Sequence, residues 1–227
     1  MIKKLSLIIY KIFFYFDKIL YFITKRKILV WFSEFLEKDA YIKIVILGKE
    51  IKFFIPNQLV GFRVDTYFTK EPETIEWINQ FNTSEEIIFW DIGANIGLYS
   101  IYNTIKHSNS KTISFEPSTS NLRVLSRNIS INNLEKRIKI FPIPLSDIEN
   151  QFLTMNEGQF IEGGALNSFG SNLDFEGNSF QSEMKYTLLG TNINFLLDNK
   201  ILDVPDYIKI DVDGIEHFIL GGADKYL

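Results

Sequence analysis

The stretch FWDIGANIGLYS, residues 89–100, joins an apolar run, an acidic residue, two glycines and the start of a helical pattern. It predicts a strand that turns sharply into a helix, with Gly93 permitting the turn and Gly97 letting the helix pack closely. The spacing D-x-G-x-x-x-G differs from the G-x-G-x-x-G of dinucleotide-binding enzymes. Asp91 would repel a pyrophosphate but suits the ammonium of an amino-acid moiety. The alternative is a purely structural turn.

The next two strands also end in acidic residues. Glu116 closes the apolar run of ISFEPS, where its carboxylate can accept hydrogen bonds from both hydroxyls of a ribose. The alternative for Glu116 is a cap on the helix that follows Pro117. Asp147, in the run LSD after the third strand, could accept from an adenine amino group or merely hold a turn.

A third motif, YIKIDVDGIEHFILGG, occupies residues 207–222. It places Asp211 and Asp213 at the carboxyl end of a strand and His217 at the start of a helix. Acidic residues at this edge can orient a sulfonium donor or take a proton from an acceptor, so these three are the candidate catalytic residues. Alternatively, Asp213 caps the helix and His217 lies at the surface or in the packing. No metal site is predicted.

The rest of the chain alternates between strand and helix patterns, which indicates a parallel α/β sheet. A lead-in hairpin turns at Gly48, and a helix begins near Pro72. The run 151–185, rich in Gly, Asn and Ser, predicts an insertion of loops or a hairpin. Strands are expected at 87–91, 112–116, 138–145 and 207–212, and helices at 98–105, 120–132, 192–200 and from 215.

In this order the three motifs resemble the FkbM family of methyltransferases. Further similar segments are FTKEPETIEWINQF (68–81), FEPSTSNLRVLSRNISINNL (115–134), IPLSD (143–147) and GGALNSFG (163–170). The resemblance implies a Rossmann-like class I methyltransferase sheet, S-adenosyl-L-methionine as cofactor, and O-methylation of a hydroxyl on a sugar, glycolipid or secondary metabolite. The acceptor would then be a small molecule or a glycan. The resemblance implies Asp91, Gly93, Asn95, Gly97 and Glu116 as cofactor-binding residues, and Asp147 joins them as a candidate from its position after the third strand.

The expected organisation has three parts. Residues 1–36 form a basic amphipathic segment, residues 37–82 a lead-in hairpin and helix, and residues 83–227 the methyltransferase domain. Domains of this kind usually continue with further strands after the position of Asp211, so we expect a sheet truncated at its C-terminus. A non-catalytic, cofactor-binding or membrane-associated remnant is therefore the alternative function. The glycine spacing disfavours a nicotinamide-dependent oxidoreductase.

The N-terminus differs in charge from the rest of the chain. Of the net charge of -4, residues 1–27 contribute +6 from seven basic and one acidic side chain, which leaves -10 elsewhere. An acidic body disfavours nucleic acid as a partner.

Lys4, Lys11, Lys18 and Lys25 form one stripe on an apolar helix, which favours an anionic membrane surface. Docking on protein and a membrane span are the alternatives. Because no signal-peptide pattern follows, we expect a cytoplasmic protein, peripheral to the membrane.

Overall fold

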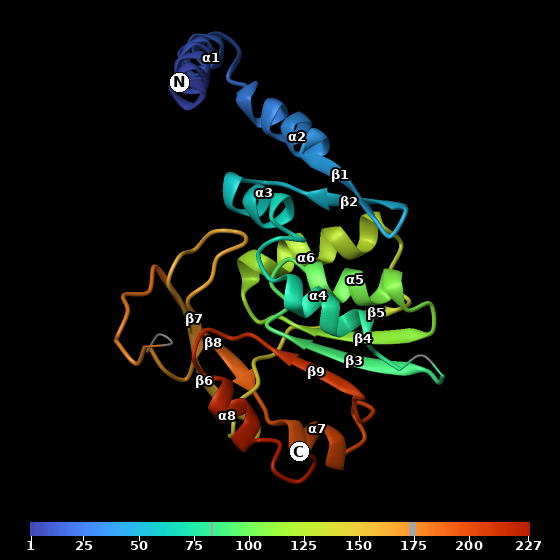
Figure 1. The fold of residues 1–227 in the computed structure, drawn as a ribbon. Coiled ribbons are helices and arrows are strands. Elements are labelled where there is room, and N and C mark those ends of the chain that lie inside the picture. Colours follow the sequence, from blue (N-terminus) through green and yellow to red (C-terminus); the bar gives the residue numbers. More distant parts are fainter. Residues whose placement is uncertain (83, 173–175) are drawn as a thin grey trace. The chain divides into compact units, whose positions relative to one another are not determined.

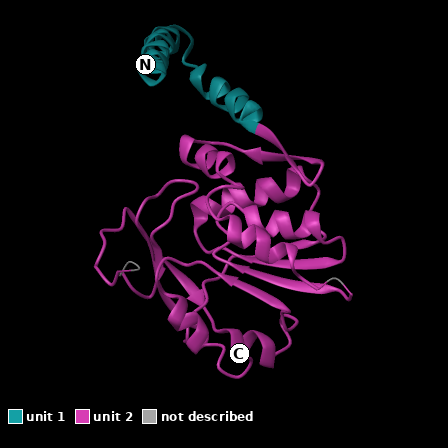
Figure 2. Cartoon of the chain, in the orientation of Figure 1, with its two compact units in different colours: residues 1–41 teal, residues 42–227 magenta. Residues whose placement is uncertain are grey.

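A computed structural model describes residues 1–82, 84–172 and 176–227 of the chain. It divides into two compact units, residues 1–41 and 42–227 (Figure 2). The predicted lead-in segment thus belongs mostly to the same unit as the parallel sheet. The predicted domain start at residue 83 lies outside the described residues, and the three-part division stays a prediction.

Unit 1 is a pair of helices, α1 (Ile2–Thr24) and α2 (Leu29–Asp39). Asp17, on α1, is buried, and its Oδ1 accepts hydrogen bonds from the N–H groups of Ile28 (2.6 Å) and Leu29 (3.2 Å). The carboxylate therefore satisfies free backbone donors at the start of α2, as a capping residue does. No helix in the described part of the chain combines the length and apolar character needed to cross a membrane.

The central sheet of unit 2 consists of four parallel strands in the order β5-β4-β3-β9. Its strands are β3 (Ile87–Ile92), β4 (Ser110–Phe115), β5 (Ile138–Phe141) and β9 (Tyr207–Ile210). This confirms the predicted α/β class with a parallel, Rossmann-like sheet. The prediction that the third strand continues to residue 145 is wrong, because Pro142 and Pro144 lack the N–H groups that a continuing strand needs.

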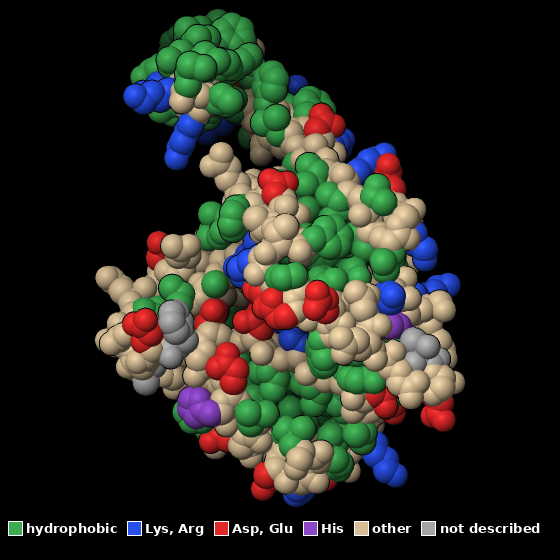
Figure 3. Space-filling view, in the orientation of Figure 1, with side chains coloured by type: hydrophobic (Ala, Val, Ile, Leu, Met, Phe, Trp, Pro, Cys, Tyr) green, Lys and Arg blue, Asp and Glu red, His purple; other side chains and the backbone are tan. Residues whose placement is uncertain are grey.

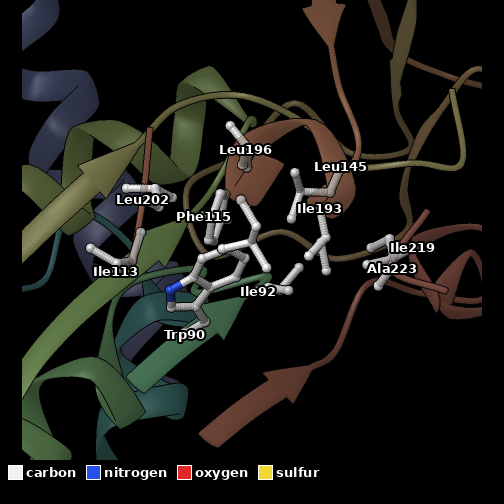
Figure 4. Close-up of a cluster of buried hydrophobic side chains, with 11 residues drawn as sticks. Trp90, Ile92, Ile113, Phe115, Leu145, Ile193, Leu196, Leu202, Ile219 and Ala223 are labelled. Carbon is white, nitrogen blue, oxygen red and sulfur yellow. The ribbon is translucent and has the colours of Figure 1, made fainter. Parts of the chain in front are cut away.

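Helices cover both faces of this sheet (Figure 1). One face carries α4 (Pro72–Asn79), α5 (Leu98–Lys106) and α6 (Thr119–Ile131), and the other carries α7 (Ile193–Asp198) and α8 (Glu216–Gly221). On the face with α7 and α8, Trp90 and Phe115 belong to an apolar core that also includes Leu196 of α7 and Ile219 of α8 (Figure 4). Burying each large apolar side chain contributes about 1.5–3 kcal/mol, which fixes the carboxyl ends of β3 and β4.

The predicted insertion forms a separate antiparallel sheet of order β7-β6-β8. Its strands are β6 (Gln151–Glu157), β7 (Asn167–Phe169) and β8 (Met184–Gly190). The segment between β6 and β7 therefore starts and ends on this sheet and reaches the edge where β3 and β9 end.

Ahead of the parallel sheet, β1 (Tyr41–Ile46) and β2 (Lys49–Phe54) form the predicted hairpin, with Gly48 at φ 78° in its turn. An unpredicted helix, α3 (Gln58–Asp65), follows it. Asn57 caps α3 by accepting from the N–H of Val60 at 2.9 Å. The short helix places Arg63 near the functional edge of the sheet.

Candidate active site and its relatives

The turn after β3 is built around two glycines with positive φ. Gly93 has φ 76°, and a Cβ there would stand 1.9 Å from the carbonyl oxygen of Asp211. Gly97, at φ 86°, precedes α5, and a Cβ there would lie 2.5 Å from the Leu125 side chain. These are the tight turn and the close helix packing predicted from the spacing. As a result, the backbone of the turn lies directly against the end of β9.

On one side of this turn lies a hollow of about 560 Å³, which we call the Glu116 hollow. Glu116 and Asn121 supply polar atoms to its wall, while Asp211 and Asp213 line it from the end of β9. Its apolar lining comes from several elements of both sheets, including Phe115, Leu145, Met155 and Phe169. The hollow therefore offers an apolar wall for a flat ring beside a carboxylate.

Glu116 is almost fully buried, with 5% of its surface exposed. Its carboxylate accepts hydrogen bonds from the N–H groups of Asn95 (2.7 Å) and Ser118 (2.9 Å). Burial raises the pKa of Glu116 to about 7, and the two backbone donors oppose that rise. The helix-cap alternative is wrong, since the Ser118 side chain caps α6 by accepting from Asn121 N–H. The Glu116 carboxylate, which lines the hollow, can therefore still accept hydrogen bonds from a ligand.

A second hollow of about 460 Å³ lies on the other side of the glycine turn, and we call it the Lys209 hollow. Its charged lining comprises Arg63, Lys70, Glu71, Lys209 and Asp211. The two hollows share three lining residues, namely Gly93, Asn95 and Asp211. They therefore meet at the carboxyl ends of β3 and β9, where the Asp211 side chain is 59% exposed.

Asp91 occupies a different place from the one expected. It is completely buried and lines neither described hollow. Its Oδ2 accepts from the Ser100 hydroxyl at 2.6 Å, and its Oδ1 lies 3.4 Å from Nζ of Lys209. Asp91 thus has no surface to offer to a ligand ammonium. Its charge acts instead on Lys209, whose side chain is 9% exposed and borders the second hollow.

Of the other predicted site residues, Asp213 lies at the Glu116 hollow, and His217 and Asp147 lie away from both hollows. Asp213, at φ 56°, lines the Glu116 hollow, and its Oδ2 accepts from the N–H groups of Leu166 (2.8 Å) and Asn167 (3.4 Å). Its alternative role as a helix cap is wrong, because no side chain caps α8. Burial raises the pKa of Asp213. His217 and Asp147 are exposed and line neither of these hollows.

The 162–167 segment, which we call the roof segment, is fastened to several elements at once. Arg63 of α3 donates to the Gly163 carbonyl at 2.6 Å, and Asn95 of the glycine turn donates to the Gly164 carbonyl at 2.9 Å. Asn121 of α6 both donates to Gly164 and accepts from Gly163. Together with the bonds to Asp213, these contacts hold the segment at the Glu116 hollow, which Gly164 and Asn167 line.

Two buried acceptors in this region lack a hydrogen-bond donor among the described residues. They are the side-chain oxygens of Asn95 and Asn167, and both residues line the Glu116 hollow. A buried amide oxygen without a donor costs free energy unless a ligand or water supplies one. The hollow is therefore suited to a ligand rich in hydroxyl or amino groups.

The sequence patterns missed Lys209, Asn121 and Asn167. A lysine inside the apolar run of a parallel strand is the one available signal for Lys209, because such strands are usually apolar throughout. The two asparagines lie in the family-like segments 115–134 and 163–170, but nothing in those segments singles them out from the other polar residues.

Residues 91–227 match the sequence model of the family described as the methyltransferase FkbM domain. The chain belongs to this family. The match begins at Asp91, just before the glycine turn, and includes Glu116, the roof segment and all of β9. As an FkbM methyltransferase domain, the chain uses S-adenosylmethionine as its cofactor.

Methyltransferase sdnD of Sordaria araneosa is 28% identical over 154 residues, which are 60% of this FkbM chain and 60% of that protein. The chain thus spans less than two thirds of this relative. Among solved structures, TYW2 from Pyrococcus horikoshii in complex with MeSAdo is 19% identical, with a TM-score of 0.34 over 48% of this chain and 40% of that one. An O-methyltransferase family protein from Burkholderia thailandensis is 11% identical, with a TM-score of 0.32 over 38% and 26% of the two chains.

The residues of the Glu116 hollow fit the adenosyl half of S-adenosylmethionine. Glu116 can accept from the ribose hydroxyls, and the unpaired oxygens of Asn95 and Asn167 can accept from further donors. The apolar wall suits the flat face of adenine. When bound, the cofactor supplies an electrophilic methyl group on a sulfonium.

Proposed function

We propose that this FkbM domain is an O-methyltransferase that acts on a hydroxyl of a small molecule, sugar or glycolipid. The acceptor oxygen attacks the sulfonium methyl in line, so that the carbon–oxygen bond forms as the sulfur–carbon bond breaks. Asp211 takes the hydroxyl proton. The supporting observation is that Asp211 lines both hollows and is exposed, whereas Asp213 is half-buried and Glu116 is buried. Asp213 remains a candidate base, restricted by its bonds to the roof segment.

Catalysis by this arrangement rests mainly on positioning. The roof segment and the glycine turn, which are bonded to each other, would hold the cofactor, and the acceptor would enter at the exposed Asp211 side chain. Aligning two reactants in this way can supply much of the rate enhancement of a methyl transfer. The non-catalytic remnant stays the alternative, and it is favoured if the chain binds cofactor but methylates no hydroxyl compound.

Glu116 gives this proposal a pH-dependent test. Ribose hydroxyls donate to the charged carboxylate, whereas the pKa of about 7 leaves Glu116 partly protonated near neutrality in the free protein. Binding therefore favours the deprotonated form, and affinity should rise between about pH 6 and pH 8 and then level off. Calorimetry with S-adenosylhomocysteine measures this profile.

The matched variant Glu116→Gln keeps the shape of the side chain but not its charge. We expect at least about tenfold weaker binding and a flat pH profile, since a charged hydrogen bond contributes about 1.5–3 kcal/mol. Glu135→Gln, at an exposed position after α6, is the control and should change neither the affinity for S-adenosylhomocysteine nor its pH profile. Binding of NAD without binding of S-adenosylhomocysteine would contradict the proposed function.

We further propose that unit 1 binds an anionic membrane surface, which would bring the enzyme to lipid-linked acceptors. Large apolar side chains are exposed along most of α1 and α2, and they cover much of the visible face of these helices (Figure 3). The four lysines of the stripe are exposed as well. Nζ of Lys18 and of Lys25 lies over aromatic rings of α1, at 4.7 Å from Phe14 and 5.4 Å from Phe22. An apolar helix with a basic stripe suits the headgroup region.

Removing the stripe should weaken binding to anionic vesicles more than tenfold at low salt, because each lysine near such a surface contributes about 1 kcal/mol. The variant replaces Lys4, Lys11, Lys18 and Lys25 with Gln, and vesicle co-sedimentation measures the loss. The control replaces the exposed unit 2 lysines Lys106, Lys111, Lys136 and Lys139 with Gln. Equal binding of the unmodified protein to neutral vesicles at high salt would argue against an electrostatic membrane contact.

A further inference from the structure

The end of β6 carries a second buried carboxylate, Glu157, which the proposed methyl transfer does not use. Glu157 has no exposed surface. The Tyr186 hydroxyl of β8 donates to its Oε1 at 2.5 Å, and the Ser120 hydroxyl of α6 donates to its Oε2 at 3.4 Å. Burying a carboxylate costs free energy unless donors surround it, so both hydroxyls stabilise the group. Glu157 thus links the antiparallel sheet to the helix that follows Glu116.

Tyr186 extends this link to the backbone just after Glu116. Its hydroxyl oxygen accepts from the N–H of Thr119, the first residue of α6, at 3.2 Å. A hydroxyl has one proton, and the short contact to Glu157 uses it, so the oxygen is left free to accept. One residue earlier, the N–H of Ser118 donates to the Glu116 carboxylate itself. The antiparallel sheet therefore holds the turn from which Glu116 receives a hydrogen bond.

The charge of Glu157 also acts on Glu116. Burial raises the pKa of Glu116 to about 7, and repulsion by Glu157 contributes to the rise. Burial and the hydrogen bond to Glu157 raise the pKa of Tyr186, which therefore stays protonated near neutrality and keeps its donor. Ionisable groups on the neighbouring elements are Asp211 and Asp213 of the same hollow, Arg63, which holds the roof segment, and the ion pair of Arg123 with Glu162. A substitution at Glu157 leaves all of these in place.

From these contacts we infer that Glu157 and Tyr186 are positioning residues for Glu116, which hold its turn against the antiparallel sheet and supply a second negative charge near it. The inference rests on the proposed function, in which Glu116 accepts hydrogen bonds from the ribose hydroxyls of the cofactor. Because a charged carboxylate is the better acceptor, the insertion then sets the pH range over which the chain binds its cofactor.

The first test removes the charge and keeps the shape. Glu157→Gln retains an oxygen that can accept from Tyr186. In the free chain, NMR of the glutamate carboxyl carbons should show Glu116 titrating at a pH lower by about half a unit or more, with Glu116→Gln identifying its signal. S-adenosylhomocysteine should then bind about two to three times more tightly at pH 6 and within about twofold at pH 8, where Glu116 is charged in both proteins. Misfolding would not produce tighter binding.

Tyr186→Phe tests how firmly the turn is held. It keeps the ring but removes the hydroxyl, so the N–H of Thr119 loses its acceptor. At pH 8 calorimetry should show at least about fivefold weaker binding of S-adenosylhomocysteine to this variant. Tyr226→Phe removes a hydroxyl that donates to Asp198 at the end of α7, and as the control it should keep the affinity of the unmodified chain.

Glu183→Gln is the control for the charge, because this exposed carboxylate precedes β8 and accepts from the N–H of Phe160 at 3.0 Å. It should change neither the titration of Glu116 nor the affinity. Weaker binding to Glu157→Gln at both pH values with an unmoved titration would overturn the inference, as would an unchanged affinity of Tyr186→Phe. If the titration moved as expected but the unmodified chain bound no S-adenosylhomocysteine, the proposed function would fail and the link between Glu157 and Glu116 would stand.

Discussion

Replacing Gly93 with alanine should destabilise the domain by several kcal/mol and abolish measurable cofactor binding. A Cβ at this position would stand 1.9 Å from the carbonyl oxygen and 2.9 Å from the carbonyl carbon of Asp211. Both are backbone atoms, so the end of β9 must move away from the glycine turn. The positive φ adds about 1–2 kcal/mol for any residue with a Cβ. Because the two hollows meet here, both should lose their shape. Denaturant unfolding and calorimetry with S-adenosylhomocysteine measure the two effects.

Gly48→Ala is the matched control for this substitution. Gly48 has nearly the same φ, 78°, in the turn of the β1–β2 hairpin, but an added Cβ would meet no atom within 4 Å. It should therefore show the backbone cost alone, about 1–2 kcal/mol, and normal cofactor affinity. If Gly93→Ala behaved like Gly48→Ala in both measurements, the close approach of the turn to β9 would have no functional importance.

Asp211→Asn should reduce turnover by about 10²–10⁴-fold, because the amide keeps the shape of the side chain but cannot take a proton. Affinity for S-adenosylhomocysteine should stay within about threefold, since the proposed contacts of the adenosyl half do not use the charge of Asp211. Single-turnover methyl transfer at saturating cofactor measures the first effect, and calorimetry measures the second. Asp203→Asn, an exposed position in the loop before β9, is the control and should leave both unchanged.

The opposite outcome is equally informative. If Asp211→Asn abolished cofactor binding and left the rate at saturation unchanged, Asp211 would belong to the donor site. The base would then be sought among Asp213, Glu216 and His217, with Asp213 first because it is the one of these three that lines the Glu116 hollow.

The parts of the fold and site that depend on residues close together in the sequence could be predicted. The strand, glycine turn and helix around Gly93 form one continuous segment, and Glu116 follows at the end of the adjacent strand in both sequence and space. Parallel β–α units keep this order, so the position of Glu116 at the sheet edge follows from the sequence alone. The insertion after β5 was equally visible from its composition.

Contacts between distant segments were not predictable in the same way. The pairing of Asp91 with Lys209 depends on the register of β9 beside β3, which sets those two residues opposite each other. Nothing in either segment specifies that register. The sequence therefore predicted Asp91 as a ligand-binding residue, although its side chain is buried next to Lys209. The role of Asp213 was hidden likewise, because its partners lie in the insertion.

Helix α3 was missed for a local reason. It is short, contains Gly61, and buries only Val60 and Val64, so its apolar periodicity is too weak to identify. The asparagine before it is the one start signal. Its omission left Arg63, and with it one attachment of the roof segment, out of the predicted site.

The roof segment has a consequence for the timing of the catalytic cycle. Its hydrogen bonds run to α3, to the glycine turn, to α6 and to the turn after β9, so the segment is anchored at separate points rather than hinged at one. A movement of the segment therefore has to open several of these bonds together. Under the proposed function, release of S-adenosylhomocysteine from beneath the segment would then be a slow step of the cycle.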